Sequence, residues 1–187
     1  MGFTLMEPLP AISTSPTKPF PKSHIAIVAV LVGIFVLAAC GGSGQTARDF
    51  EVVQFDGETF RLSQVTADHA VMVNFWYPSC PPCREEMPAI EAAWQELKDE
   101  PVRILGLYVP QGFDSEQDAR DFVAELGLTF DFATDHLARI AQAYDLEYFP
   151  MTYFIDMDGE VVATYISTLE KEEIVRQVRA LIGGPAS

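Results

Sequence analysis

The sequence predicts an α/β protein with helices on both faces of a mixed β-sheet. Apolar strand segments alternate with helical stripes between residues 70 and 144, and a strand hairpin follows at 151–166. Alternating strands and helices build a parallel sheet, whereas a hairpin contributes antiparallel strands. With 49% hydrophobic residues, the chain of 187 residues is long enough to bury one substantial core.

The amino-terminal part of the chain reads as a leader rather than as part of the fold. Residues 1–24 are rich in Pro, Ser and Thr, and the next fifteen residues, 25–39, are uncharged and mostly apolar. That run is short for a membrane-spanning helix, which needs about 20 residues, but it suits a signal peptide. We therefore assign 1–39 to the leader and signal peptide, 40–48 to a flexible Gly-rich tether, and 49–184 to the folded domain.

The first predicted elements of the domain are a hairpin, a buried strand and a helix. Val52–Phe55 and Glu58–Leu62 flank Asp56-Gly57, which is a strong turn signal. Ala70–Trp76 is almost continuously apolar, as expected of a central strand buried on both faces. The helix that follows has apolar residues spaced for one buried stripe, at Met87, Ile90, Trp94 and Leu97.

The second half repeats this alternation. Val102–Val109 is a second buried strand, and a helix then begins at Asp114-Ser115 and ends at Gly127. Thr129–Ala133 is a third, short strand. The inward-facing residues of the helix from Asp114 are Ala119, Phe122, Val123 and Leu126. A later helical stripe consists of Leu137, Ile140, Ala141 and Tyr144.

The chain closes with a hairpin and a helix. Met151–Ile155 and Val161–Ile166 are strands joined by a turn, and Ser167 with Glu170 forms a capping box for the last helix. That helix buries an apolar stripe consisting of Ile174, Val178, Leu181 and Ile182.

Two cysteines, Cys80 and Cys83, lie between the central strand and its helix with two prolines between them. A Cys-x-x-Cys at this position is typical of a redox pair. The start of a helix stabilises an anion, so we expect Cys80 to be the attacking thiolate and Cys83 the more buried, resolving thiol. A purely structural disulfide is the alternative, although so small a loop stabilises little. No metal site is expected, because His69 and His136 are isolated.

Glu86 and Pro150 are further candidates for the site. Glu86 lies at the edge of the apolar stripe and three residues after Cys83, hence next to it on the helix. A partly buried carboxyl with a raised pKa could accept the proton of Cys83; the alternative is an ordinary surface acid. Pro150 follows Phe149 at the start of a strand, which suits either an edge strand or a cis peptide.

The charge of the chain excludes nucleic acid as a partner. Its formal net charge is −15, and 26 acids face 10 bases once Glu7, Lys18 and Lys22 of the leader are removed. No basic patch could then neutralise phosphates. An acidic surface otherwise indicates solubility.

Leu37-Ala38-Ala39-Cys40 resembles the bacterial lipobox, in which the cysteine is lipidated and becomes the first residue of the mature chain. The alternative is an uncleaved amino-terminal anchor with an incidental Cys40. Both interpretations predict a domain that is held on the extracytoplasmic face of the bacterial cell membrane.

Trp76–Pro88, together with Phe149–Gly159, resembles the TlpA/ResA family of membrane-tethered thioredoxin-like proteins, which overlaps the redoxin and AhpC/TSA grouping. The similarity covers about residues 49–182. It implies a thioredoxin-like three-layer α/β/α fold with a mixed central sheet, an extra amino-terminal hairpin and a central αβ insertion near 113–135. One departure is Ser79, because the family usually has Trp directly before the first cysteine.

The resemblance also implies a site. Cys80 attacks and Cys83 resolves, giving a Cys80–Cys83 disulfide, and Glu86 matches the active-site glutamate of the family. Pro150 matches a cis-proline that faces the dithiol, with Phe149 and Trp76 beside it in substrate binding. Asn74 stands where plain thioredoxins have a buried Asp.

By this resemblance, the chain is a monomeric thiol–disulfide oxidoreductase without a cofactor. It would reduce protein disulfides, as in cytochrome c maturation, with electrons from a membrane thiol donor. A thiol peroxidase of the AhpC/TSA type is an alternative, although it needs Thr or Ser where this chain has Tyr77. A copper-delivery module that uses His136 is a third.

Overall fold

Strand β4 (Ala70–Trp76) forms the centre of the sheet, and all seven of its residues are buried, as their apolar run predicts. Strand β5 (Val102–Tyr108) pairs with β4 in parallel, and β6 (Asp131–Thr134) pairs with β5 in parallel. Strand β7 (Met151–Ile155) lies on the other side of β4 and runs antiparallel to it. The predicted mixed sheet is therefore confirmed.

The computed structural model describes residues 45–183; the predicted leader, lipobox and Cys40 lie outside this range. Strand β8 (Glu160–Tyr165) pairs with β7, and β1 (Gln45–Thr46) pairs with β8, both antiparallel. The six strands follow the order β1-β8-β7-β4-β5-β6. A flexible tether that reaches to 48 is thus wrong, because β1 and the Ala47 N–H to Gly159 O bond of 2.8 Å attach its second half to the sheet.

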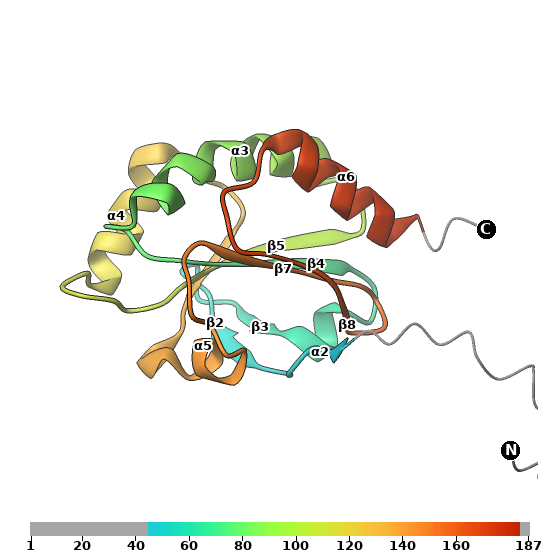
Figure 1. Cartoon of the computed structure of the whole chain (residues 1–187), viewed down its shortest axis with the longest axis horizontal. Coiled ribbons are helices and arrows are strands. Elements are labelled where there is room, and N and C mark those ends of the chain that lie inside the picture. Colours follow the sequence, from blue (N-terminus) through green and yellow to red (C-terminus); the bar gives the residue numbers. More distant parts are fainter. Residues whose placement is uncertain (1–44, 184–187) are drawn as a thin grey trace, which may run out of the picture. The chain divides into compact units, whose positions relative to one another are not determined.

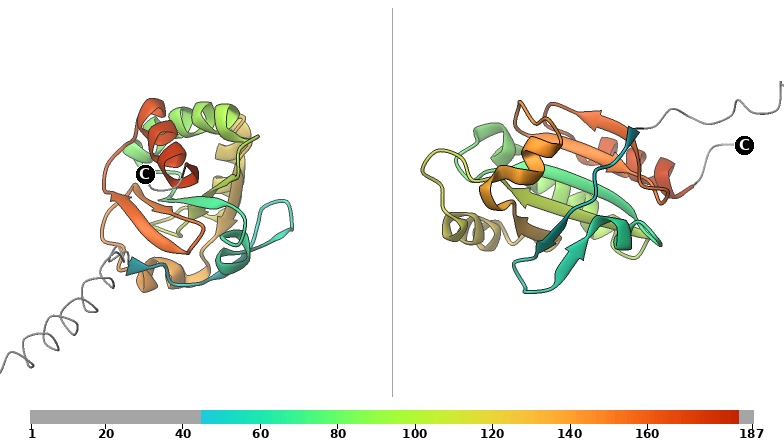
Figure 2. Two further views of the ribbon diagram at one scale, coloured as in Figure 1. Left: turned by 90° about the vertical axis from the view of Figure 1, so that its right-hand side faces the viewer. Right: turned by 90° about the horizontal axis from the view of Figure 1, so that it is seen from below.

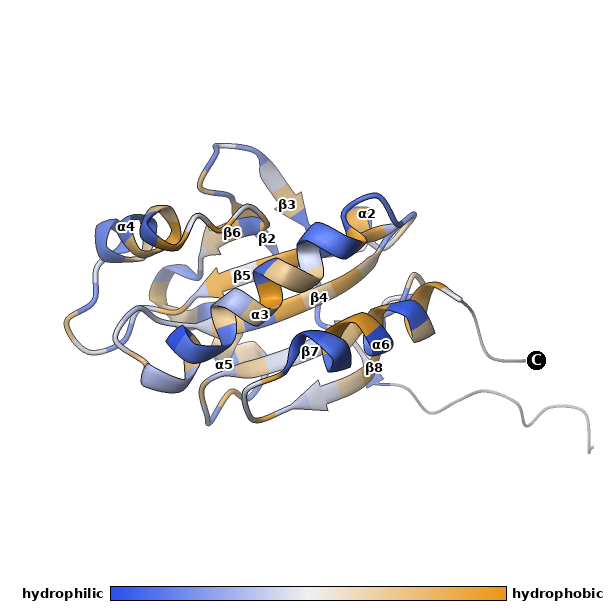
Figure 3. Cartoon of the chain, turned by 90° about the horizontal axis from the view of Figure 1, so that it is seen from above, coloured by the Kyte–Doolittle hydropathy of each residue, from blue (hydrophilic) through white to orange (hydrophobic). Residues whose placement is uncertain are grey.

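Helices cover one face of the sheet, and a hairpin with short helices covers the other (Figures 1 and 2). The first face carries α3 (Pro81–Leu97), α4 (Glu116–Leu126) and α6 (Lys171–Ile182); Figure 3 shows α3 and α6 above the strands and α4 to one side of them. The opposite face carries the remaining elements, which are β2 (Glu51–Val53), β3 (Thr59–Arg61), α2 (Leu62–Val65) and α5 (Arg139–Ala143). These are the three layers that the sequence predicts, with the hairpin in place.

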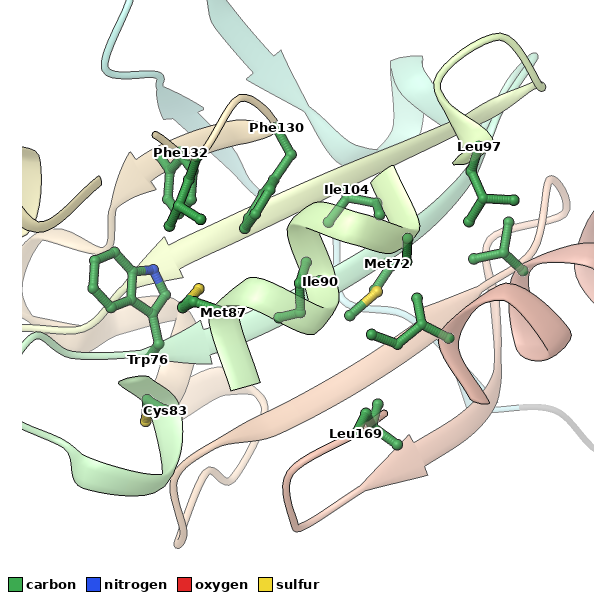
Figure 4. Close-up of a cluster of buried hydrophobic side chains, with 14 of the residues drawn as sticks. Met72, Trp76, Cys83, Met87, Ile90, Leu97, Ile104, Phe130, Phe132 and Leu169 are labelled. Atoms are coloured by element: carbon green, nitrogen blue, oxygen red, sulfur yellow. The ribbon is translucent and has the colours of Figure 1, made fainter. Parts of the chain in front are cut away.

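The alternation of side chains along β4 divides the core into two apolar clusters. Met72 and Trp76 point towards α3 and join the cluster that also contains both cysteines. Val71, Val73 and Phe75 point to the opposite cluster, under the hairpin and α5. Figure 4 shows the first cluster, with Cys83 at one end and Leu97 near the other.

The segment after β6 departs from the predicted regular helix. A 3₁₀ turn (His136–Ala138) precedes the five-residue α5, and Leu137 has a φ of 63° with 72% of its surface exposed. The buried Asp135 carboxylate accepts the N–H groups of Ile140 and Ala141, at 3.0 and 2.8 Å. Because these bonds fix where α5 begins, Leu137 is left outside the inward stripe, and its predicted burial is wrong.

The start of the last helix is also later than predicted. Helix α6 begins at Lys171 after Glu170, which makes no side-chain capping bond, so the capping box with Ser167 is wrong. Leu169, just before this start, is buried and donates its N–H to a core carboxylate. The next residue, Glu170, is extended, at φ −83° and ψ 155°, where the sequence suggested a helix.

Helix α4 follows the prediction more closely. Ser115 and Asp118 cap its start reciprocally, and Gly127 ends it in the left-handed conformation at φ 61°. Leu126, expected inside, has 37% of its surface exposed. Within residues 45–183, no helix has both the length and the apolar composition needed to cross a membrane.

Candidate active site

The cysteines occupy the junction between β4 and α3 and are joined as a disulfide, with an S–S distance of 2.05 Å. Cys80 is the N-cap of α3, and Pro81 and Pro82 fill its first two positions, where a missing N–H matters little. The first N–H of the helix is consequently that of Cys83, and it donates to Cys80 Sγ at 3.2 Å. A thiolate at Cys80 would receive this bond together with the positive end of the helix dipole.

Burial differs little between the two sulfurs. Cys80 as a residue is 2% exposed and Cys83 is 0% exposed. Cys83 extends the apolar cluster beside Trp76 and Met87 (Figure 4). Both cysteines are therefore buried in the oxidised protein, and the predicted greater burial of Cys83 stays a prediction for the reduced form.

Glu86 lies one turn after Cys83, and only 1% of its surface is exposed. Its Oε1 accepts the Leu169 N–H at 3.0 Å, and its Oε2 accepts Asn74 Nδ2 at 3.1 Å. Burial raises the pKa of Glu86 to about 7, because the two hydrogen bonds lower it by less than desolvation raises it. Glu86 is thus a buried titratable group, and the alternative of an ordinary surface acid is wrong.

Asn74 connects this carboxyl to strand β7. Its Nδ2 also donates to Thr152 Oγ1 at 2.9 Å, and the two residues are direct cross-strand partners. Asn74 Oδ1 is buried without a hydrogen-bond partner in the described part of the chain. Both hydrogen bonds of the Asn74 amide are therefore made by its NH2 group. They link Glu86 to Thr152, which lies two positions after Pro150.

The Phe149–Pro150 peptide is cis, as the resemblance implies. Pro150 is buried, and the half-buried Phe149 packs edge-on against Tyr77, with ring centroids 5.0 Å apart. Phe149 is accordingly next to the loop that leads into Cys80.

Trp76 does not fit direct substrate binding. It is fully buried, and its ring contacts those of Tyr108, Phe122 and Phe132 at centroid distances of 5.3–6.0 Å. A side chain without exposed surface cannot touch a docking protein, contrary to the expectation for Trp76.

Two further residues, Asp114 and Arg84, hold the loop before Cys80, and sequence reasoning missed both. Ser79 donates its N–H and its Oγ–H to Asp114 Oδ2, at 2.9 and 2.7 Å. Arg84 donates to the Pro78 carbonyl at 3.2 Å, with its guanidinium over the Phe122 ring. Ser79 and Asp114 are 35 positions apart, so no local pattern announces their contact.

Metal ligands do not converge in residues 45–183, where no group of three or more His, Cys, Asp or Glu side chains could hold an ion. His136 lies in the 3₁₀ turn before α5, away from the cysteines in sequence. Nothing described here supports the copper-delivery alternative.

The model of the AhpC/TSA family matches residues 43–164, well over half of the chain. The chain belongs to the AhpC/TSA family. This AhpC/TSA protein is 32% identical to the thiol-disulfide oxidoreductase ResA of Geobacillus kaustophilus over 138 residues, which are 74% of this chain and 77% of ResA. It is 31% identical to the thioredoxin-like protein YneN of Bacillus subtilis over 135 residues, 72% of this chain and 78% of YneN.

Solved structures confirm the fold of this AhpC/TSA protein. A thiol:disulfide interchange protein of the thioredoxin family from Chlorobium tepidum TLS matches with a TM-score of 0.67 at 21% identity, covering 77% of this chain and all of that one. StoA from Bacillus subtilis matches with a TM-score of 0.64 at 20% identity, covering 70% and 96%. The predicted thioredoxin-like fold, the family and the enzyme class, a thiol–disulfide oxidoreductase, are confirmed.

Proposed function

We propose that this protein reduces disulfide bonds of other proteins on the extracytoplasmic face of a bacterial cell membrane, and that it works as a monomer. One observation carries the proposal: a Cys80–Cys83 pair at the start of α3 is followed, one turn on, by a buried carboxyl whose pKa is about 7. This arrangement supplies an attacking sulfur, a resolving sulfur and a proton acceptor that changes charge near neutral pH.

The first step uses Cys80. In the reduced protein its thiolate attacks one sulfur of a substrate disulfide, the substrate S–S bond breaks, and a mixed disulfide forms between Cys80 and the substrate. The released substrate thiolate takes a proton from water. Phe149 and Pro150, next to Tyr77, are the residues that we expect to align the substrate backbone.

The second step uses Cys83 and Glu86. The Glu86 carboxylate accepts the proton of the Cys83 thiol, and the new thiolate attacks Cys80 Sγ. The mixed disulfide breaks, the second substrate thiolate leaves, and the Cys80–Cys83 disulfide remains. Two electrons have then moved to the substrate, and a dithiol donor in the membrane must return two for the next cycle.

The direction of electron flow is proposed from the resemblance to the TlpA/ResA family, and a potential tests it. A disulfide reductase should have a reduction potential closer to that of thioredoxin, about −270 mV, than to that of a strong oxidant, about −120 mV. Equilibration of the full chain with glutathione redox buffers measures this value. A potential near the oxidant would reverse the proposed direction.

Trapping tests whether the substrate is a protein. With Cys83→Ser in the full chain, Cys80 can attack but the mixed disulfide cannot resolve, so the substrate stays covalently bound and can be isolated. The matched control is the double variant Cys80→Ser/Cys83→Ser, which should trap nothing. Equal yields from the two variants would contradict a protein substrate.

Membrane attachment is proposed from the lipobox at Cys40. Cys40→Ala should release the domain from the detergent phase of membrane fractions into the aqueous phase. Retention of the variant would mean that the apolar run 25–39 is itself the anchor.

A thiol peroxidase is the second candidate, because the AhpC/TSA family model matches the chain. Tyr77 stands where the peroxidase needs Thr or Ser. Rapid peroxide consumption by the Cys83→Ser variant would favour the peroxidase, whereas slow consumption would support the reductase.

A further inference from the structure

We propose that Asp114 is a positioning residue that makes the dithiol more reducing, by holding a negative charge against the residue that precedes Cys80. This inference rests on the proposed function as a disulfide reductase. It gives a role to Ser79, the residue that departs from the family pattern, and to the loop at the start of the central insertion.

The Asp114 carboxylate is fixed from two directions. Its Oδ2 accepts both the N–H and the Oγ–H of Ser79, at 2.9 and 2.7 Å. Its backbone carbonyl accepts the Tyr108 hydroxyl at 2.7 Å. Since Tyr108 is fully buried at the end of β5, the loop that carries Asp114 is tied to the core as well as to Ser79.

The other charged groups near the dithiol loop either bond to other residues or are exposed to solvent. On α3, Arg84 donates to the Pro78 carbonyl and covers the Phe122 ring, while Glu85 is exposed and Glu86 is buried. At the start of α4, Glu116 pairs with Arg120 at 2.7 Å.

Asp118, the other acid at the start of α4, bonds to Ser115. The electrostatic field at Tyr108 is negative. Burial is the main cause that raises the pKa of Tyr108, and the charges of Asp114, Asp118 and Glu116 raise this pKa further. Of these acids, Asp114 is the one bonded to the neighbour of Cys80.

The charge acts on the reduced form of the pair. The Cys83 N–H and the start of α3 stabilise a Cys80 thiolate, whereas a nearby carboxylate destabilises it. The disulfide is neutral and is affected much less. Asp114 therefore disfavours the reduced protein relative to the oxidised one, and a less stable dithiol gives up its electrons more readily.

Asp114→Asn separates the charge from the contact, since an amide oxygen can still accept the Ser79 N–H. Removing one charge at this range should lower the pKa of Cys80 and shift the equilibrium with glutathione towards the dithiol by roughly three- to tenfold. A tenfold shift corresponds to about 30 mV for this two-electron couple. The full chain is measured at pH 8, where the thiolate is well populated, by equilibration with glutathione and by the rate of Cys80 alkylation.

Two controls isolate the charge. Asp118→Asn removes an acid that does not touch Ser79, and Ser79→Ala removes one hydrogen bond while leaving the charge; each should change the equilibrium constant less than about twofold. An unchanged constant in Asp114→Asn, or an equal change in Asp118→Asn, would overturn the proposal. Because glutathione replaces the natural substrate, this result is independent of the trapping test on which the proposed function depends.

Discussion

Each cysteine of the pair has a carboxyl group nearby, and the two carboxyls differ in their surroundings. Asp114, on the Cys80 side, is half-buried and accepts two hydrogen bonds from Ser79. Glu86, on the Cys83 side, is fully buried and has a pKa of about 7.

The contrast shows that the same functional group can have different chemical roles when its exposure to water differs. Asp114 is only partly buried and is bonded to Ser79, so we assign it the role of a fixed negative charge. A carboxyl in a dry environment gains and loses a proton near pH 7, so Glu86 can move one. The following predictions test whether this division holds, from the largest expected effect to the smallest.

Glu86→Gln should slow the resolution of the mixed disulfide by roughly 10²-fold, because the proton acceptor for Cys83 is lost. The rate in the natural sequence should rise with pH and level off above about 7, where Glu86 is ionised. The variant should lack that inflection. Stopped-flow measurement of resolution from pH 5 to 9 checks both.

Glu85→Gln is the matched control for this experiment, since Glu85 is the exposed neighbour on the same helix. It should resolve at the natural rate with the natural pH profile. Equal slowing by both substitutions would mean that the buried carboxyl has no special role.

Glu86→Gln should also change the stability of the oxidised protein in a pH-dependent way. The folded-state pKa of Glu86, about 7, lies above the ordinary value of 4.5 for a Glu carboxyl, so the natural protein loses stability relative to the variant as pH rises from about 4.5 through 7. Between pH 4.5 and 8 the stability of the variant relative to the natural protein should increase by on the order of 3 kcal/mol, in addition to a pH-independent cost, because the amide can accept only one of the two N–H bonds. Urea unfolding at pH 4.5 and 8 measures it; a difference that does not depend on pH would contradict the raised pKa.

Asn74→Asp should move the inflection of the resolution rate upward by about one pH unit or more. The substitution puts a second carboxyl where Nδ2 now lies 3.1 Å from Glu86 Oε2, and two adjacent carboxyls cannot both ionise readily. Thr152→Ser keeps the hydroxyl that Asn74 contacts and should leave the inflection in place. A rate profile of Asn74→Asp that overlays the natural one would show that Asn74 does not position Glu86.

Salt should reduce the effect of Asp114→Asn on the glutathione equilibrium and should leave the pH inflection caused by Glu86 nearly unchanged. At 1 M ionic strength the screening length falls to about 3 Å, so the shift in the glutathione equilibrium caused by Asp114→Asn should shrink by roughly half or more. The inflection that belongs to the buried Glu86 should move much less. Measurements at 0.1 and 1 M salt make the comparison, and equal salt sensitivity of the two effects would erase the distinction.

Much of the fold could be predicted because local patterns encode it. The apolar run of β4, the turn signal between β2 and β3, and the Ser115 and Gly127 ends of α4 are all readable within a few residues. The start of α6 was not, because a bond between the Leu169 N–H and Glu86 spans 83 positions. The short α5 likewise depends on Asp135, whose carboxylate accepts two backbone N–H groups further along the chain.

The site divides in the same way. Its cysteines are found from their spacing, and Glu86 from the helical stripe, which anticipated that it would be partly buried. Contacts across the sheet or between loops, such as Asn74 with Thr152 or Ser79 with Asp114, join residues 78 and 35 positions apart. Only the assembled fold brings them together.

Strand β1 has a geometric consequence for a chain anchored at Cys40. Only residues 41–44 separate that cysteine from Gln45, the first residue of β1. Through β8 and β7, β1 lies near the level of Val71 at the beginning of β4, whereas Cys80 follows the far end of that strand, roughly 20 Å away. An anchor at Cys40 would therefore join the domain at the end of the sheet opposite the dithiol. A thiol donor in the bilayer would then need an extramembrane part that extends far enough to reach Cys80.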